Sequence, residues 1–229
     1  MTASEAAFDP RIGIDESGTG DFFGPLVIAA CYAGPEQART LAGVRDGKRL
    51  KDDACLELDG VVRKACPHAI VVIGPAKYNE LYEKVRNLNA LVAWGHARAI
   101  ESLLEQVGCE RVVTNRFADP ESLRQVLMTR DRQVRLESGV NAEGDVAVAA
   151  ASVLARAEFI RSLRSLSSTF GGYLPKGANW NAVEAGARIV GREGKTALKD
   201  VAKLHFKTLQ DVLKLARAEG QFNLSLIHI

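Results

Sequence analysis

The stretch IGIDESGTGDFFGPLVIAA, residues 12–30, carries the clearest structural pattern in the chain. Two short apolar runs rich in β-branched residues, 12–15 and 25–33, lie on either side of the glycine-rich segment 17–24. This arrangement is typical of a strand, a tight turn and a second strand. The pattern therefore predicts that a β-hairpin opens the fold.

The remainder of the chain alternates strand and helix patterns and then becomes helical. Further strands are predicted at residues 69–73, 111–114 and 133–136. Helices are predicted at 78–107, with a break near 87–89 or at Gly95, in the Ala-rich run after Gly144, and at 182–190 and 198–216, with a loop at 165–181. This order predicts an α/β fold with a mixed β-sheet flanked by helices and a helical C-terminal extension.

Composition excludes several classes of protein. With 229 residues, 47% of them hydrophobic and 25% charged, the chain can bury a sizeable core and is not intrinsically disordered. The apolar runs are too short to span a bilayer, and the N-terminus lacks the pattern of a signal peptide, so we expect a cytoplasmic protein. The net charge of +2 does not by itself indicate a nucleic-acid binder. Basic residues are enriched at 181–217, which makes that segment a candidate phosphate-facing surface.

Asp15 and Glu16 are adjacent carboxylates at the end of a predicted buried strand. Such a position is costly for a carboxylate unless it is paired or bound to a metal. The alternative is structural, with Asp15 capping a turn and Glu16 facing solvent. The glycines that follow mimic a dinucleotide-binding fingerprint, but that fingerprint needs a helix after the glycines, and here a strand is predicted.

Several segments, taken in order, resemble the bacterial ribonuclease HIII family. They are IGIDESGTGDFFGPLVIAA at 12–30, DGKRLKD at 46–52, YNELY at 78–82, NLN at 87–89, TNRFA at 114–118, AE at 142–143, VAAASVLAR at 148–156 and AKLHF at 202–206. The resemblance extends over residues 11–210, and the collinear order makes it far more specific than any single motif.

The resemblance implies a ribonuclease H-like fold and an endonuclease that cuts the RNA strand of RNA/DNA hybrids, leaving 5′-phosphomonoesters. It also implies two divalent ions, Mg²⁺ or Mn²⁺, whose ligands are hard oxygen donors. The implied catalytic and metal-binding positions are Asp15, Glu16, Asn115 and Glu143. The implied nucleic-acid contacts are Gly18, Thr19, Gly20 and Lys48.

Asn115 departs from the family pattern, which has Asp at this position. An amide oxygen can ligate a hard cation, but weakly and without charge, so poor occupancy of at least one metal position is expected. A natural loss of activity, a deliberate substitution and a sequence error all remain open as explanations. The alternative function is therefore a catalytically silent protein of the same fold that binds RNA/DNA hybrids.

The domain organisation is predicted as a single ribonuclease H-like domain at 1–223, with C-terminal helices at about 180–217. Typical relatives carry an additional N-terminal substrate-binding domain, which is expected to be absent here. Residues 224–229 continue no amphipathic pattern and are predicted to be a non-native tail. Nothing in the sequence suggests a membrane or an obligate protein partner, and a monomer is expected.

Overall fold

The computed structural model describes residues 8–43, 47, 50–114, 134–138 and 144–226. Within them, five strands form one sheet in the order β3-β2-β1-β4-β5. The strands are β1 (Arg11–Ser17), β2 (Leu26–Ala33), β3 (His68–Ile73), β4 (Arg111–Thr114) and β5 (Arg135–Ser138). β1 pairs antiparallel with β2 and parallel with β4, so the predicted opening hairpin and mixed sheet are confirmed.

The chain divides into two compact units. The first comprises Met1–Ser17, Val27–Val71 and Asn87–Glu158 and contains most of the sheet. Its helices are α1 (Pro35–Thr40), α2 (Asp52–Ala65), α4 (Leu88–Leu104) and the first half of α6 (Val146–Thr169). Between α3 (Pro75–Val85) and α4 the chain takes a left-handed conformation at Arg86, and the Asn87 side chain caps α4 by accepting a hydrogen bond from the Ala90 amide. The predicted break in the helical segment is therefore at residues 86–87.

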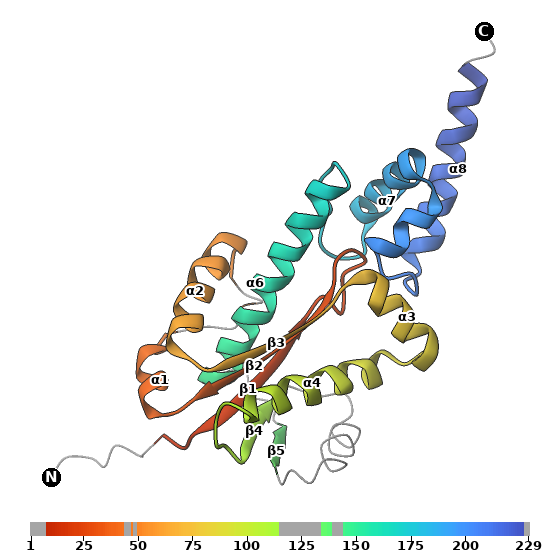
Figure 1. Ribbon diagram of the computed structural model, residues 1–229. Coiled ribbons are helices and arrows are strands. Elements are labelled where there is room, and N and C mark those ends of the chain that lie inside the picture. Colours follow the sequence, from red (N-terminus) through yellow and green to blue (C-terminus); the bar gives the residue numbers. More distant parts are fainter. Residues whose placement is uncertain (1–7, 44–46, 48–49, 115–133, 139–143, 227–229) are drawn as a thin grey trace, which may run out of the picture. The chain divides into compact units, whose positions relative to one another are not determined.

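Two glycines allow helices to lie directly on the central strands. A Cβ at Gly13 of β1 would lie 2.0 Å from the carbonyl carbon of Ala147 at the start of α6. A Cβ at Gly95 of α4 would lie 2.5 Å from the Ile28 side chain of β2. Because Ile28 pairs with Glu16, three residues after Gly13, the strand pleat places the two helices on opposite faces of the sheet (Figure 1).

The second unit comprises Gly18–Leu26, Val72–Arg86 and Phe159–Ile229. It holds the glycine-rich turn, α3 (Pro75–Val85), the second half of α6, α7 (Trp180–Glu193), the 3₁₀ helix η3 (Lys195–Asp200) and α8 (Thr208–Leu226). Gly186 of α7 allows close packing against α8, because a Cβ there would lie 2.6 Å from the Val212 side chain. The helical C-terminal extension predicted from the sequence is therefore present.

The largest differences from the sequence predictions lie in α6 and in the segment before α8. Helix α6 continues to Thr169, through residues predicted as loop, and the Ser167 and Thr169 hydroxyls at its end donate hydrogen bonds to carbonyls four residues earlier. The helix predicted at 198–216 is replaced by η3, an irregular segment and α8. The irregular segment is held by tertiary hydrogen bonds, such as that from the Lys203 amide to the Phe22 carbonyl oxygen at 2.8 Å.

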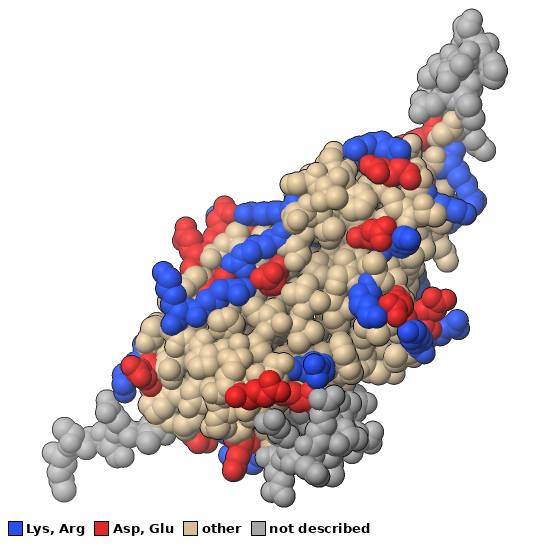
Figure 2. All heavy atoms as spheres, viewed as in Figure 1, with Lys and Arg blue, Asp and Glu red and all other residues tan. Residues whose placement is uncertain are grey.

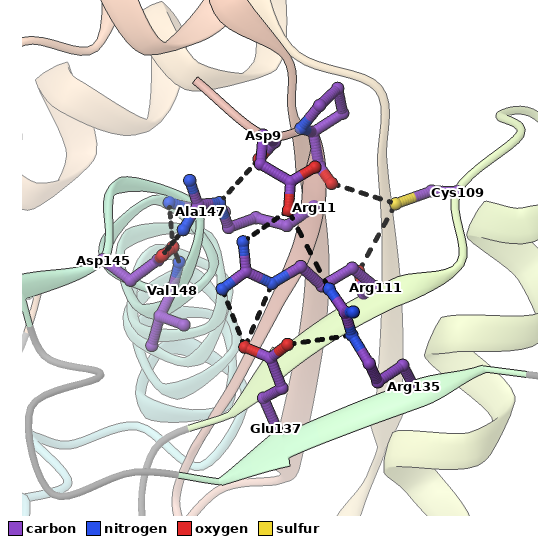
Figure 3. Close-up of polar contacts among 10 residues, drawn as sticks. Asp9, Arg11, Cys109, Arg111, Arg135, Glu137, Asp145, Ala147 and Val148 are labelled. Carbon is purple, nitrogen blue, oxygen red and sulfur yellow. Dashed lines mark hydrogen bonds and ion pairs between the residues drawn. The ribbon is translucent and has the colours of Figure 1, made fainter. Parts of the chain in front are cut away.

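An ion-pair network joins the N-terminal ends of three neighbouring strands (Figure 3). Arg111 at the start of β4 donates to Glu137 of β5 at 2.7 Å and to Asp9 at 2.7 Å. Arg11 at the start of β1 pairs with Asp145 at 2.9 Å, whose other carboxylate oxygen accepts from the Ala147 amide and so caps α6. The network thus ties the edge of the sheet to the first turn of α6.

We expect Glu137→Gln to lower the melting temperature by roughly 2–4 °C at neutral pH, a modest effect because the side chain is about a third exposed. The hydrogen bond from Arg111 lowers the pKa of Glu137 below its ordinary value of 4.5. Because the folded-state pKa is depressed, the stabilisation is present above pH 4.5 and is lost as the pH falls through the folded-state pKa. Thermal melts from pH 7 to pH 3, with the exposed Glu110→Gln as control, should show the difference disappearing in acid. An equal difference at both ends of the pH range would contradict this.

Candidate active site

Asp15 lies near the C-terminal end of the central strand β1 and is only 2% exposed. Ile12 and Ile14 are fully buried, which fixes the strand in the core. Asp15 follows Gly13 by two residues, so the pleat places it on the sheet face that α6 covers. The structure therefore shows a buried carboxylate where the sequence predicted a metal ligand, rather than at a solvent-exposed turn.

Glu16 lies on the opposite face and contacts α4. Its Oε2 atom is 2.9 Å from Nε2 of His96, whose side chain is 1% exposed. Glu16 itself is partly exposed, so the histidine holds one carboxylate oxygen while the side chain still reaches the surface. Glu16 is therefore both paired with His96 and partly exposed to solvent.

His96 is a residue that sequence reasoning missed. It lies 80 positions from Glu16, in a helix whose pattern indicates only an apolar core. The available signal was the neighbouring Gly95, which brings α4 onto Ile28, the cross-strand partner of Glu16. His96, the residue after Gly95, thus lies where α4 packs on the sheet and contacts the strand that carries the carboxylates.

The glycine-rich turn contains the predicted nucleic-acid contacts Gly18, Thr19 and Gly20. Gly18 has φ +93°, and a Cβ there would lie 2.2 Å from the Pro25 carbonyl oxygen, so only glycine fits. Gly20 is exposed, and no described heavy atom lies within 4 Å of a Cβ built on it. The structure therefore leaves the backbone of Gly20 accessible to a ligand. The strand β2 follows, which excludes the dinucleotide fingerprint.

Three of the predicted site residues, Lys48, Asn115 and Glu143, lie outside the described residues. Their described neighbours are informative. Thr114, which precedes Asn115, pairs with Ile14 in parallel register, so β4 ends beside the Asp15 end of β1. Gly47, which precedes Lys48, contacts α6 so closely that a Cβ would lie 2.9 Å from the Ser152 carbonyl oxygen. Any side chain at that position would crowd this helix.

Among the residues described, no group of three or more His, Cys, Asp or Glu side chains is placed to hold a metal ion. Two of the four predicted ligand positions fall outside that part of the chain. The donors that are placed, Asp15 and Glu16, are carboxylates, the ligand type that suits a hard divalent cation, but the pleat of β1 directs them to opposite faces of the sheet. No helix in the described ranges is long and apolar enough to cross a membrane.

Not every basic residue of the segment 181–217, which was predicted as a phosphate-facing surface, lies at the surface. Lys203 is fully buried, so its ammonium group cannot face a phosphate. On the face shown in Figure 2, Lys and Arg side chains lie beside Asp and Glu side chains. That mixture agrees with the small net charge of +2.

Comparison with protein families gives a match to Ribonuclease HII over residues 12–209. Ribonuclease HIII of Protochlamydia amoebophila is 45% identical over 206 residues, covering 89% of this chain and 68% of that protein. Ribonuclease HIII of Chlamydia pneumoniae is 42% identical over 208 residues, covering 89% and 70%. Both relatives carry the name of the family that the sequence motifs resemble.

Solved structures give the same result. Bst-RNase HIII in complex with Mn²⁺ matches with a TM-score of 0.86 at 33% identity, covering 93% of this chain and 72% of that chain. The ribonuclease H2 from Pyrococcus horikoshii has a TM-score of 0.74 at 20% identity and shares the fold. The predicted ribonuclease H-like fold is confirmed.

Proposed function

Because this chain belongs to the ribonuclease HII family, with ribonuclease HIII proteins as relatives over most of its length, we propose that it hydrolyses the RNA strand of RNA/DNA hybrids. The observation that carries the proposal is the carboxylate pair at the end of β1, with Asp15 buried and Glu16 held by His96. Cleavage would be endonucleolytic and would leave 5′-phosphomonoesters.

The residues that would hold the metal ions are Asp15, Glu16 and Glu143, with Asn115 in the remaining position. Carboxylate oxygens suit Mg²⁺ and Mn²⁺, and a relative of the same fold has been solved with Mn²⁺. When bound, two such ions supply an activated water and stabilisation of the leaving 3′ oxygen. The three carboxylates would balance three of the four positive charges of two divalent ions. The neutral side chain of Asn115 would leave the fourth charge without an anionic ligand.

The chain's own residues would bind and orient the substrate. In the turn at Gly18–Gly20, Gly20 is exposed, and its backbone amide is suited to donate a hydrogen bond to phosphate or to the ribose 2′-OH, which distinguishes RNA from DNA. Lys48 would neutralise a backbone phosphate. His96, donating from Nε2, would hold the Glu16 carboxylate in one orientation.

Asn115 is the specific observation that favours the second candidate, a catalytically silent protein that binds RNA/DNA hybrids. A magnesium titration separates the two. An enzyme with one weak metal position should gain activity at high Mg²⁺ or in Mn²⁺, whereas a silent binding protein should not.

The test of the proposed function uses a labelled RNA/DNA hybrid, an all-DNA duplex and an all-RNA duplex, each with Mg²⁺ and with Mn²⁺. We expect cleavage of the hybrid alone, with the cuts in the RNA strand. Asp15→Asn, which keeps the volume of the side chain but removes its charge, should abolish cleavage. Failure of the chain both to bind and to cut the hybrid would overturn the proposal.

We expect His96→Ala to weaken Mn²⁺ binding by roughly 10- to 100-fold, because partners that orient a ligand commonly have effects of this size. The measurement is calorimetric titration with Mn²⁺ in the Asn115→Asp background, which restores the full carboxylate set. His68→Ala, which removes a half-buried histidine bonded to the Cys66 carbonyl, is the matched control. Equal Mn²⁺ affinity in His96→Ala and its parent would show that the histidine does not serve Glu16 as a ligand.

A further inference from the structure

Lys203 carries a buried ammonium group whose hydrogen bonds all go to one segment. Its side chain is 0% exposed. The Nζ atom donates to the backbone carbonyl oxygens of Asp21 at 2.8 Å, Gly24 at 2.7 Å and Phe23 at 3.4 Å. An ammonium group has three N–H donors and no acceptor, so the three carbonyl oxygens supply one acceptor for each donor.

This burial is energetically costly. Removal from water lowers the pKa of Lys203 to about 7, and the nearby Asp21 carboxylate opposes that shift. The Tyr78 ring lies 5.7 Å from Nζ, and the His205 side chain is close enough for the lysine charge to lower the pKa of that imidazole. An apolar side chain would fill the same space without the desolvation cost. The position therefore uses the three donors rather than the bulk of the lysine.

The segment that Lys203 holds is also fixed by backbone contacts on both sides. The Lys203 amide donates to the Phe22 carbonyl at 2.8 Å, and the Gly24 amide donates to the Val201 carbonyl at 3.0 Å. On the other side, the Gly177 amide donates to the Asp21 carboxylate at 2.6 Å. Residues 21–24 thus have little freedom, and the Gly18–Gly20 turn, whose last residue Gly20 is exposed, ends directly before them.

The 201–204 segment is itself anchored to α3. The side-chain amide of Asn79 donates to the carbonyl oxygens of Lys199 at 3.0 Å and Ala202 at 2.9 Å, and its oxygen accepts from the Leu204 amide at 2.9 Å. The support for the glycine-rich turn therefore runs from α3 through residues 199–204 to the Lys203 ammonium group.

We propose that Lys203 is a positioning residue for the hybrid, whose ammonium group fixes residues 21–24 so that the Gly18–Gly20 amides already point toward the nucleic acid. This inference rests on the proposed function, because it assigns Lys203 to the turn expected to contact the substrate. Preorganisation of this kind increases affinity by reducing the ordering cost of binding. Lys203 acts without touching the nucleic acid, in contrast to the phosphate-facing role predicted for its segment.

The test compares Lys203→Met, which keeps the chain length but removes all three donors, with Lys207→Met, an exposed lysine four residues later. Binding to a labelled RNA/DNA hybrid is measured in Ca²⁺, with hydrogen exchange of the 16–26 peptide followed in the free protein. We expect Lys203→Met to weaken hybrid binding roughly tenfold and to speed exchange in the turn. Calorimetric Mn²⁺ affinity, measured in the Asn115→Asp background, should stay the same.

Lys203→Gln keeps two N–H donors, so its hybrid affinity and its exchange rate should lie between those of the parent and of Lys203→Met. If the methionine variant does not fold, the glutamine variant is used for the comparison. Unchanged hybrid affinity in the folded variant, with faster exchange in the turn, would overturn the positioning role while leaving the proposed function intact. Absence of hybrid binding by the parent chain would instead overturn the proposed function.

Discussion

Asn115→Asp is expected to cleave an RNA/DNA hybrid roughly 100- to 1000-fold faster than the chain with Asn115. The substitution supplies the fourth carboxylate in a site whose two divalent ions carry four positive charges. A neutral amide oxygen leaves one charge unbalanced where negative charge develops in the reaction, and electrostatic stabilisation there is worth several kcal/mol. The placement is supported by β4, which ends at Thr114 beside Ile14 of the strand that carries Asp15.

The measurement is the initial rate of hybrid cleavage by both proteins at equal Mg²⁺, with hybrid affinity determined separately in Ca²⁺. Asn181→Asp makes the same chemical change at an exposed position of α7 and should leave the rate unchanged. If Asn115→Asp binds the hybrid as well as its parent but cuts it no faster, position 115 is not a metal ligand. The dependence of the rate on Mg²⁺ should also shift to lower concentration in the aspartate variant.

Gly13→Ala is expected to destabilise the fold by at least about 4 kcal/mol, a large share of the roughly 5–15 kcal/mol by which native proteins are stable. A Cβ at this position would lie 2.0 Å from the carbonyl carbon of Ala147 and 2.2 Å from the amide nitrogen of Val148. Both are backbone atoms in the first turn of α6, so no side-chain rotation can relieve the overlap. Either α6 must move away from β1 or the strand must leave the sheet.

Urea unfolding followed by circular dichroism would measure this effect. Gly60→Ala is the matched control, because no described heavy atom lies within 4 Å of a Cβ at that helical position and alanine favours a helix by up to about 1 kcal/mol. We expect the control to match or exceed the parent in stability. A Gly13→Ala protein that unfolds at the same urea concentration as the parent would refute the close packing of α6 on β1.

Local patterns were sufficient to predict most of the fold. The β-branched runs around the glycine-rich segment gave the β1–β2 hairpin, and short apolar runs gave β3 and β4. The predicted fifth strand begins at residue 133, whereas β5 begins at Arg135. These elements were predictable because their apolar periodicity and turn residues lie within a few positions of one another.

Contacts between distant segments were not predictable in this way. Glu16 and His96 are 80 positions apart, and Lys203 is about 180 positions from the carbonyl groups it holds. Lys203 lies in a segment rich in basic residues, so composition indicated a phosphate-facing surface rather than a buried ammonium group. The candidate carboxylates Asp15 and Glu16 were identified from their position at a strand end, whereas the assignments of Lys48, Asn115 and Glu143 stay predictions.

The parallel pairing of β1 with β4 determines when the site can assemble during synthesis. Ile12 pairs with Val112, exactly one hundred positions later in the chain. At about 5–20 residues per second, a ribosome leaves the β4-facing edge of β1 without its partner for roughly 5–20 seconds. During that time Asp15 is already synthesised, but the strand beside it is open to other extended chains. The hairpin with β2 covers only the other edge of β1, so during this interval protection of the β4-facing edge depends on whatever chaperone binds it.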